Sequence, residues 1–529
     1  MTELLPTHAV FVTGHAPAVE VRSFAGAGTL TVRHWGDCVA EQRWAGEGIA
    51  TFDALPPGGY AVELRENGDL VARTAIEIVT DPRASLRYGF VVDFRPGREL
   101  ESFADNLRRL HLTAVQFYDW AYRHADLLGG GEQYDDALGQ PVSLTTVRAL
   151  VSTCHAIGAD ALGYAAVYAA GPKEWGDWEH AALLTPTGRP YSLGDFLFLV
   201  DPAHSDWCRH FRTELADASA QLGFDGFHLD QYGYPKRAVR PDGVPVDVAR
   251  SFGTMLEEVR AELPGKRLVF NNVNDFPTWS SGAAPQDAMY IEVWPPHVEL
   301  DDLGRVVSRA RAAGSGKPVV IAAYQHVYDS APAEPSDRAT ALTMATLFSH
   351  GATHLLCGEA DRILVDPYYV RNHVAEHSTM QLLTRWYDFL VEHVELLLPP
   401  DIVEVTGSYA GQYNDDLDVA YAEIPVVGHA RAGCVWRRIT QAQDRLVVHL
   451  INLAGQPDTL WDAPRSAPVD PGVGTLRVRR VGGEPPRVRV ADPDRGRALV
   501  DVAVRTDGDH AVAELPPPHL WQIVVIDLA

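Results

Sequence analysis

Two kinds of hydrophobic periodicity follow one another along the chain. Up to about residue 84, and again from about residue 401, apolar and polar residues alternate in short runs separated by turns rich in Pro, Gly and Asp. Alternation with period two predicts strands with one buried face, and its recurrence between turns is typical of β-sandwiches. Between these regions, short apolar runs are each followed by a stretch with apolar residues at three- and four-residue steps, which predicts strand and helix in turn.

The central region contains enough strands for a closed barrel. Eight apolar runs predict strands: 88–94, 114–119, 161–168, 226–231, 268–273, 290–294, 318–324 and 353–359. The segments 207–222, 248–263, 336–350 and 376–397 have helical periodicity. A (β/α)8 TIM barrel of about 300 residues accounts for this pattern. We therefore predict three domains, an N-terminal Ig-like β-sandwich (residues 1–84), a catalytic barrel (85–400) and a C-terminal β-sandwich (401–529).

The strand Gly226–Gln231 carries the first candidate catalytic residue. Period-two alternation places His228 and Asp230 on one face and Phe227 and Leu229 on the other. The outer face of a barrel strand is covered by helices and must be apolar, so Asp230 points into the barrel or its mouth. Glu292 ends a second strand of the same layout. A lone Asp at a strand end is as often a turn cap, but two inward carboxyl groups favour acid/base or nucleophilic catalysis.

Further polar and aromatic residues lie at or just after the predicted strand ends, where barrel enzymes build their active sites. Aromatic faces pack on the apolar faces of pyranose rings, so the set is consistent with a sugar pocket, although each member is as often structural. The candidate sugar-binding residues are Tyr118, Asp119, Trp120, Tyr122, Asn272, Tyr324, Glu359 and Asp366.

The composition limits the partners. The chain has 45 basic and 70 acidic residues, a net charge of −25, which disfavours nucleic acid and anionic membranes and suits a neutral ligand. No run approaches the roughly 18 apolar residues of a membrane span, and Met1–Ala16 does not resemble a secretory signal. Five scattered cysteines without a CxxC pair favour reduced thiols. We expect a cytoplasmic protein.

Four segments together resemble the landmark motifs of glycoside hydrolase family 66, which contains endo-dextranases and cycloisomaltooligosaccharide glucanotransferases. The segments, in chain order, are Val115–His124, Asp225–Asp230, Tyr290–Trp294 and Leu364–Tyr369. The resemblance extends to the domain order, so it covers essentially the whole chain.

The resemblance implies a retaining glycoside hydrolase of α-1,6-linked glucan, either dextran or isomaltooligosaccharides. By the resemblance, Asp230 is the nucleophile and Glu292 the acid/base, and neither a metal nor another cofactor takes part. Cyclising members carry a long carbohydrate-binding insertion in the barrel, and no segment here is long enough to be one. Hydrolysis or simple transglycosylation is therefore expected before cyclisation, and another α-glucan linkage stays open.

Two hypotheses of other classes remain. A metal-dependent barrel hydrolase would use His228 and Asp230 as ligands, with His354 or His124, but too few ligands are evident and such a histidine is more often an interior hydrogen-bonding residue. A non-catalytic carbohydrate-binding protein would not need the carboxylate pair. Metal analysis and sensitivity to a chelator would separate the metal hypothesis from the metal-free one.

Overall fold

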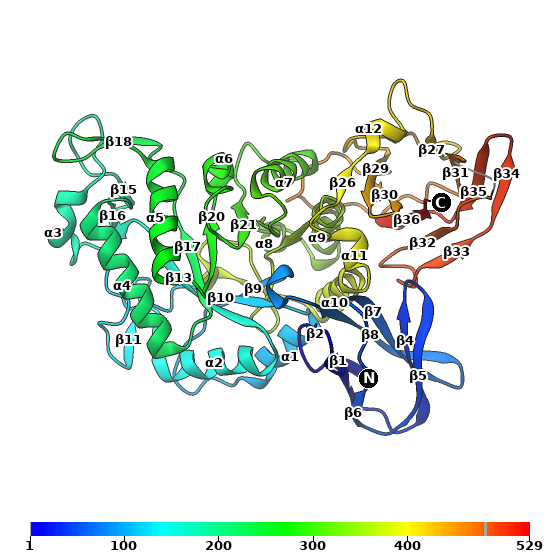
Figure 1. The fold of residues 1–529 in the computed structure, drawn as a ribbon, viewed down its shortest axis with the longest axis horizontal. Helices are drawn as coiled ribbons and strands as arrows, with labels where there is room; N and C mark the ends of the chain where they lie inside the picture. The colour runs from blue at the N-terminus through cyan, green and yellow to red at the C-terminus, as the bar shows by residue number, and fades with distance from the viewer. Residues whose placement is uncertain (1, 481–483, 529) are drawn as a thin grey trace.

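A computed structural model describes residues 2–480 and 484–528. Its centre is a sheet of eight parallel strands, which occupies the cyan and green part of the molecule in Figure 1. In sheet order the strands are β9 (Tyr88–Val91), β10 (Ala114–Phe117), β13 (Asp160–Ala166), β17 (Gly226–Asp230), β20 (Arg267–Asn271), β21 (Ala288–Glu292), β22 (Val319–Ala322) and β23 (Ala352–His354). All eight predicted barrel strands are present, and the predicted TIM barrel is confirmed.

A helical segment follows each strand and packs on the outside of the barrel. The helices are α1 (Glu101–Arg109), α2 (Leu144–Ala156), α4 (Ser205–Leu222), α5 (Val248–Glu262), α6 (Thr278–Ser281), α7 (Leu300–Gly314), α9 (Ala333–Ser349) and α10 (His377–Glu392). The predicted helix ends agree with the observed ends to within a few residues. Helix α4, for example, ends before Gly223, which adopts the left-handed conformation with φ of 82°. The predicted helix 376–397 breaks at His393 into α10 and α11 (Val394–Leu397).

The seam between β23 and β9 closes the barrel through the segment after β23. Thr353 donates its hydroxyl to Leu86 O (2.9 Å), and Gly358 lies so close to β9 that a Cβ atom there would be 2.2 Å from Phe90 N. The Glu359 carboxylate accepts hydrogen bonds from the backbone N–H groups of Val92 (2.7 Å) and Asp93 (3.2 Å). Glycine and a carboxylate thus replace regular strand pairing at this seam.

The N-terminal region is a sandwich of two sheets, blue in Figure 1. The smaller sheet contains β1 (Glu3–Pro6), β3 (Ala18–Arg22) and β6 (Gly48–Thr51); the larger contains β2 (Phe11–Val12), β8 (Asp69–Val79), β7 (Gly58–Glu66), β4 (Ala27–His34) and β5 (Asp37–Ala45). Apolar residues of both sheets form a separate core that includes Val19, Leu30 and Val62.

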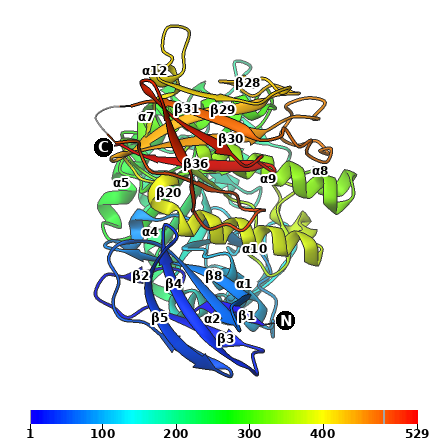
Figure 2. The same cartoon turned by 90° about the vertical axis from the view of Figure 1, so that its right-hand side faces the viewer.

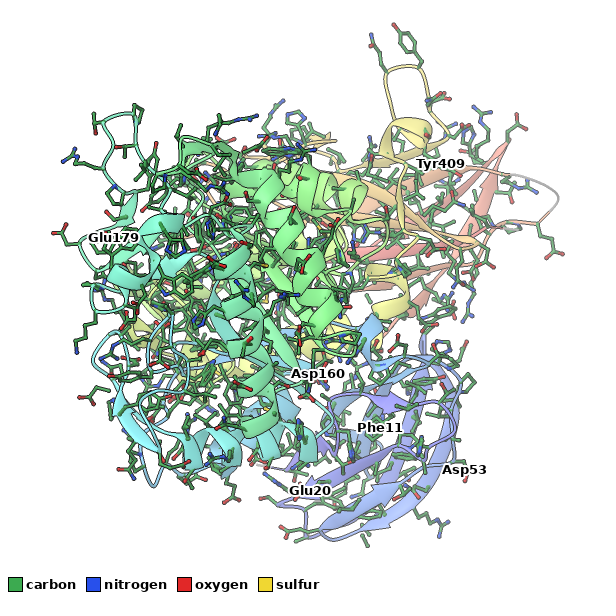
Figure 3. All side chains as sticks on the ribbon, turned by 60° about the vertical axis from the view of Figure 1, so that its left-hand side comes forward. Phe11, Glu20, Asp53, Asp160, Glu179 and Tyr409 are labelled. Atoms are coloured by element: carbon green, nitrogen blue, oxygen red, sulfur yellow. The ribbon has the colours of Figure 1, made fainter. Side chains whose placement is uncertain are left out.

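The C-terminal region is a second sandwich. One sheet orders β26 (Val403–Glu404), β29 (Val435–Ala442), β30 (Arg445–Asn452), β36 (Trp521–Asp527), β32 (Val488–Ala491) and β33 (Val500–Val502), with β28 (Val426–Val427) beside β29. The other orders β27 (Leu417–Ala420), β31 (Gly474–Arg479), β35 (His510–Leu515) and β34 (Val504–Asp507). Figure 3 locates Phe11, Glu20 and Asp53 in the N-terminal sandwich and Tyr409 in the C-terminal one.

Helix α10 lies where the barrel meets both sandwiches, as Figure 2 shows from the side. Its residues contact β7 and β8 of the N-terminal sandwich. On another side, Trp386 and Phe389 pack on Trp521 of β36, with ring centroids 5.7 and 5.3 Å apart. All three aromatic side chains are fully buried, so α10 is a shared core element. No helix within the described residues has both the length and the apolarity of a membrane span.

Candidate active site

Asp230 and Glu292 end β17 and β21 and face one pocket of about 230 Å³ at the carboxyl-terminal mouth of the barrel. The alternation predicted for β17 holds, because His228 and Asp230 line this pocket while Phe227 packs outward against Phe224. Other residues of the wall come from strand ends and from loops far apart in the sequence. They include Tyr118, Asp119, Tyr164, Tyr232, Asn271, Trp294, Tyr324, Tyr368 and Tyr369.

Asn271, the last residue of β20, connects the two carboxyl groups. Its Nδ2 donates to Oδ1 of Asp230 (2.7 Å) and to Oε2 of Glu292 (2.9 Å). β20 lies between β17 and β21 in the sheet, so its terminal side chain projects between the two acids. Each acid also accepts a phenol hydrogen bond on its other oxygen, Asp230 from Tyr164 (2.7 Å) and Glu292 from Tyr324 (3.0 Å).

The surroundings of these two acids favour different protonation states. Burial, and after it the charge of nearby Asp230, raises the pKa of Glu292 to about 7. Burial also raises the pKa of Asp230, to about 6, but the hydrogen bonds from Asn271 and Tyr164 oppose that rise because they stabilise its anion. At neutral pH the pair therefore favours a proton on Glu292 and a negative charge on Asp230.

Aromatic rings form the inner wall of the pocket. Tyr118 stacks on Tyr369, with centroids 4.2 Å apart, and the hydroxyls of Tyr369 and Tyr290 are 3.3 Å apart. Deeper in the barrel, the His228 ring lies edge-on to Tyr290 (4.7 Å) and its Nδ1 is 3.2 Å from the Tyr88 hydroxyl. Burial lowers the pKa of His228 to about 3, so this ring is a neutral packing group.

Five of the ten predicted site residues line the pocket: Tyr118, Asp119, Asp230, Glu292 and Tyr324. Asp119 has φ of 49°, a left-handed conformation that turns the chain immediately after Tyr118. Burial, together with the charges of Asp136 and Asp230, raises its pKa well above the usual range. A carboxyl group held in this way suits hydrogen bonding to a neutral hydroxyl-rich ligand.

The other five predicted site residues lie outside the pocket wall. Trp120 is fully buried and donates its Nε1–H to Tyr164 O (3.1 Å), and Tyr122 packs edge-on against Tyr134. Glu359 belongs to the barrel seam, where it also pairs with Arg98. Asp366 accepts the N–H of Tyr368 (2.8 Å) and so shapes the loop that carries Tyr368 and Tyr369.

Asn272 also differs from its predicted role. It lies just beyond the end of β20, and its Nδ2 donates to the backbone oxygens of Phe270 (3.2 Å) and Tyr290 (3.0 Å). Strand alternation gives the position in the pocket to Asn271 instead. Asn271, Tyr164 and Tyr369 were missed by the sequence prediction, although two adjacent asparagines at a strand end were a usable signal for the first of these.

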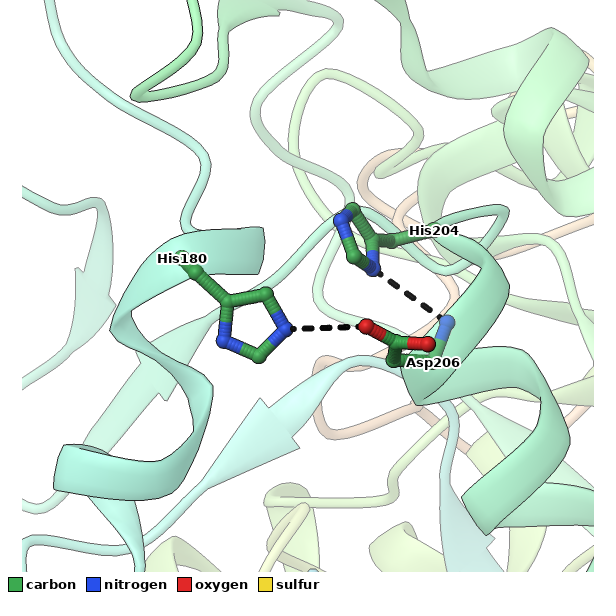
Figure 4. A group of neighbouring side chains, drawn as sticks. All are labelled: His180, His204 and Asp206. Atoms are coloured by element: carbon green, nitrogen blue, oxygen red, sulfur yellow. Dashed lines mark hydrogen bonds and ion pairs between the residues drawn. The ribbon is translucent and has the colours of Figure 1, made fainter.

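One group of side chains in the described part of the chain has the spacing of metal ligands, and Figure 4 shows it: His180, His204 and Asp206. None of the three lines the pocket of Asp230. His204 Nδ1 accepts the N–H of Asp206 (3.3 Å) at the start of α4, His180 Nε2 is 3.4 Å from Asp206 Oδ2, and Arg209 pairs with the other carboxylate oxygen. These contacts account for the group as a helix cap with its ion pairs.

The three histidines of the metal hypothesis make other contacts. His228 faces Tyr88, and His354 hydrogen bonds through Nε2 to Ala323 O (2.9 Å). Burial lowers the pKa of His124 to about 4, and its ring lies edge-on to Tyr164. Among the described residues, none of these histidines joins Asp230 in a set with ligand spacing.

The comparison with protein families decides the family. The model of glycosyl hydrolase family 66 matches residues 49–525, which is most of the chain and includes every residue of the pocket. The chain belongs to this family.

Individual family 66 relatives are distant from it in sequence. The chain is 26% identical over 332 residues to the cycloisomaltooligosaccharide glucanotransferase of Niallia circulans, covering 58% of this chain and 34% of that protein. It is 22% identical over 470 residues to the dextranase of Streptococcus salivarius, covering 75% of this chain and 56% of that protein. The matches thus span between a third and somewhat over half of these relatives' own length.

Solved structures share the fold over nearly the whole chain. A crystal structure of Paenibacillus sp. cycloisomaltooligosaccharide glucanotransferase, complexed with cycloisomaltoheptaose, matches with a TM-score of 0.88 at 20% identity and covers 99% of this chain and 100% of that one. An α-amylase from Geobacillus thermoleovorans, complexed with acarbose, matches with a TM-score of 0.51 at 13% identity over 84% of this chain and 98% of its own. The three-part architecture of this chain is therefore that of a solved family 66 protein.

Proposed function

We propose that this protein is a retaining glycoside hydrolase of α-1,6-linked glucan, in which Asp230 is the nucleophile and Glu292 the acid/base. The observation that carries the proposal is the bridge made by Asn271. One amide nitrogen bonds to an oxygen of each acid, so these two oxygens are no farther apart than the sum of the two bonds, 2.7 and 2.9 Å. Retaining enzymes hold their two carboxyl groups about 5–5.5 Å apart, and inverting enzymes leave roughly 6.5–9.5 Å for a water molecule. The spacing here supports retention.

In the first step, the Asp230 carboxylate attacks the anomeric carbon and the glycosidic bond breaks. Glu292 transfers its proton to the departing sugar oxygen, so that the enzyme is left with a glucosyl ester on Asp230 and an ionised Glu292. In the second step, Glu292 takes a proton from water, whose oxygen attacks the anomeric carbon and breaks the ester bond. The raised pKa of Glu292 and the hydrogen bonds to ionised Asp230 match these starting states.

The substrate class rests on the relatives and on the chemistry of the pocket. The relatives are named a dextranase and a cycloisomaltooligosaccharide glucanotransferase, and both names denote proteins acting on isomaltose-type glucans. The pocket wall combines tyrosine rings with hydroxyl, amide and carboxyl groups, which suits the apolar faces and polar edges of glucose. In the second step an acceptor sugar can replace water, and transglycosylation on the same linkage is therefore the second candidate.

Proton NMR of the first products released from dextran tests the mechanism. We expect the α-anomer to appear before mutarotation, with smaller isomaltooligosaccharides as products. An initial β-anomer would contradict the proposed retention, and absence of any cleavage of dextran or isomaltooligosaccharides would contradict the substrate.

Azide distinguishes the roles of the two acids. With an activated α-isomaltooligosaccharide glycoside, Asp230→Ala plus azide should yield the β-glycosyl azide, because azide attacks directly from the face that Asp230 occupied. Glu292→Ala plus azide should yield the α-glycosyl azide, because azide then displaces the Asp230 ester. The opposite assignment of products would exchange the two roles.

A further inference from the structure

A second hollow of about 360 Å³ opens beside the catalytic pocket. Three residues, Tyr232, Val273 and Trp294, line both of them, so the hollow adjoins the pocket across a common wall. Its other side is formed by the loops after β17 and β20, including Lys236, Asn274 and Phe276. Its volume lies within the range of roughly 300–1,000 Å³ that small-ligand sites occupy.

An exposed tryptophan stands next to this hollow. Trp279, on α6, is 68% exposed and is the one tryptophan among the exposed large apolar side chains of the described residues. Its ring lies against that of Phe276, which lines the hollow, with centroids 5.6 Å apart at 60°. Phe276 is itself buried, so it supports Trp279 from the protein side and leaves the indole in contact with solvent. The exposed indole is therefore free to stack on a ring that lies at the edge of the hollow.

The loop that presents Trp279 is held in a defined conformation. Asn274 and Asp275 have φ of 52° and 66°, which non-glycine residues adopt only where other contacts fix them. The Asn274 side chain accepts the N–H of Trp294 (3.2 Å) and donates to Pro295 O (3.1 Å), and Asp275 pairs with Arg309 of α7 (2.6 Å). The loop after β20 is thereby tied to the segment after Glu292, so the hollow is preorganised.

We propose that this hollow binds a glucosyl unit of the substrate chain outside the catalytic pocket, with Trp279 stacking on the apolar face of the sugar. The inference rests on the proposed function. The position beside the pocket points to the occupant, because a glucan chain that extends from the carboxyl groups past Trp294 and Tyr232 reaches this hollow next. The exposed Lys236, whose ammonium lies 5.1 Å from the Phe276 ring centroid, offers a hydrogen-bond donor to the sugar hydroxyls.

Chain-length dependence tests the inference. We would measure kcat/KM on dextran and on the shortest isomaltooligosaccharide that the wild type cleaves. Trp279→Ala should lower kcat/KM on dextran by about 3- to 10-fold, the loss expected for one stacking contact, and leave the shortest substrate unchanged. Trp279→Phe should retain most of the wild-type value on dextran. Tyr413→Ala, which removes an aromatic side chain that is 90% exposed on the C-terminal sandwich, is the matched control and should change neither value.

Other outcomes of this experiment distinguish failure of the inferred glucosyl site from failure of the proposed function. An active wild type whose Trp279→Ala variant is unchanged on dextran, or equally impaired on both substrates, overturns this inference alone. A wild type that cleaves no α-1,6-glucan overturns the proposed function, and the inferred glucosyl site with it. Thermal unfolding of each variant should match the wild type, because Trp279 is on the surface.

Discussion

Asn271 has an unusual position for a single side chain, because its one amide nitrogen donates to both candidate catalytic acids. These hydrogen bonds favour the ionised form of each acid and lower both pKa values. We predict that Asn271→Ala moves both limbs of the pH profile of kcat/KM to higher pH and lowers kcat by about 10- to 100-fold, since the acids lose both their spacing and their donor.

The neighbouring asparagine provides the matched control for that experiment. Asn272 bonds to backbone oxygens and does not line the pocket, so Asn272→Ala should lower the free energy of unfolding by roughly 1–3 kcal/mol and leave the pH profile in place. If Asn272→Ala shifted the profile and Asn271→Ala did not, the assignment of the two residues would have to be exchanged.

The wild-type pH dependence follows from the two acids. Below about pH 6, Asp230 gains a proton and loses its nucleophilic charge; above about pH 7, Glu292 loses the proton it must donate. We therefore predict a narrow bell-shaped profile of kcat/KM with its maximum between these values, and the limbs report the pair jointly. A profile that stays flat from pH 5 to 9 would be incompatible with this pair.

Tyr324 adjusts mainly one limb of that profile. Its hydroxyl donates to Glu292 and lowers the pKa of this acid. Tyr324→Phe removes the donor and keeps the ring, so the alkaline limb should move to higher pH by more than the acid limb, because Tyr324 bonds to Glu292 and not to Asp230. Kinetics on dextran across pH 4–9 would show the displacement, and Glu292→Gln should abolish the alkaline limb together with about 10²- to 10⁴-fold of the activity.

At the scale of single elements, the seam between β23 and β9 contains one buried ion pair. The Arg98 and Glu359 side chains are 6% and 7% exposed, and Glu359 also accepts two backbone N–H groups. Glu359→Gln leaves Arg98 charged and unpaired in the interior, so we predict a loss of about 3–5 kcal/mol in the free energy of unfolding, measured in urea, with KM on dextran unchanged.

An exposed ion pair is the control for the seam. Glu132 pairs with Arg148 at 63% and 39% exposure, so Glu132→Gln should cost less than about 1 kcal/mol. If Glu359→Gln raised KM strongly and left the free energy of unfolding unchanged, the result would support the sugar-binding role predicted from the sequence and contradict a structural role at the seam.

The sequence predicted strands best where burial imposes a pattern. The eight barrel strands and the inward position of Asp230 follow from apolar runs and alternation, and both are present. Strand β5 gives a weak signal, because its residues such as Glu41 and Arg43 are exposed and its run lacks a continuous apolar face. Tyr164 and Tyr369 were missed because the contact of Tyr164 with Asp230 and the stacking of Tyr369 on Tyr118 depend on long-range closure of the barrel, which local periodicity does not encode. The predicted domain limits at residues 84 and 400 stay predictions.

At the scale of the whole molecule, buried charges join the three parts around α10. Arg73 of β8 pairs with Glu392 of α10 (2.6 Å), with both side chains 2% exposed, while Asp388 of α10 pairs with Arg497 (2.9 Å) from the C-terminal region. Arg73→Met leaves the Glu392 carboxylate buried without this cation, and we predict a loss of about 3–5 kcal/mol in the free energy of unfolding. The double variant Arg73→Met/Glu392→Leu should recover much of that loss, since neither charge remains. An additive double variant would show that the pair is not coupled.

The burial of α10 on several sides has a practical consequence for engineering. Enzymes with appended modules are often shortened to the catalytic domain. In this protein, removal of either sandwich would expose the buried surface of α10 to solvent. Loss of β36 would expose Trp386 and Phe389, and loss of β8 would leave Glu392 without its cation. A shortened barrel should therefore accumulate as inclusion bodies, and libraries aimed at new linkage specificity are best built on the untrimmed chain.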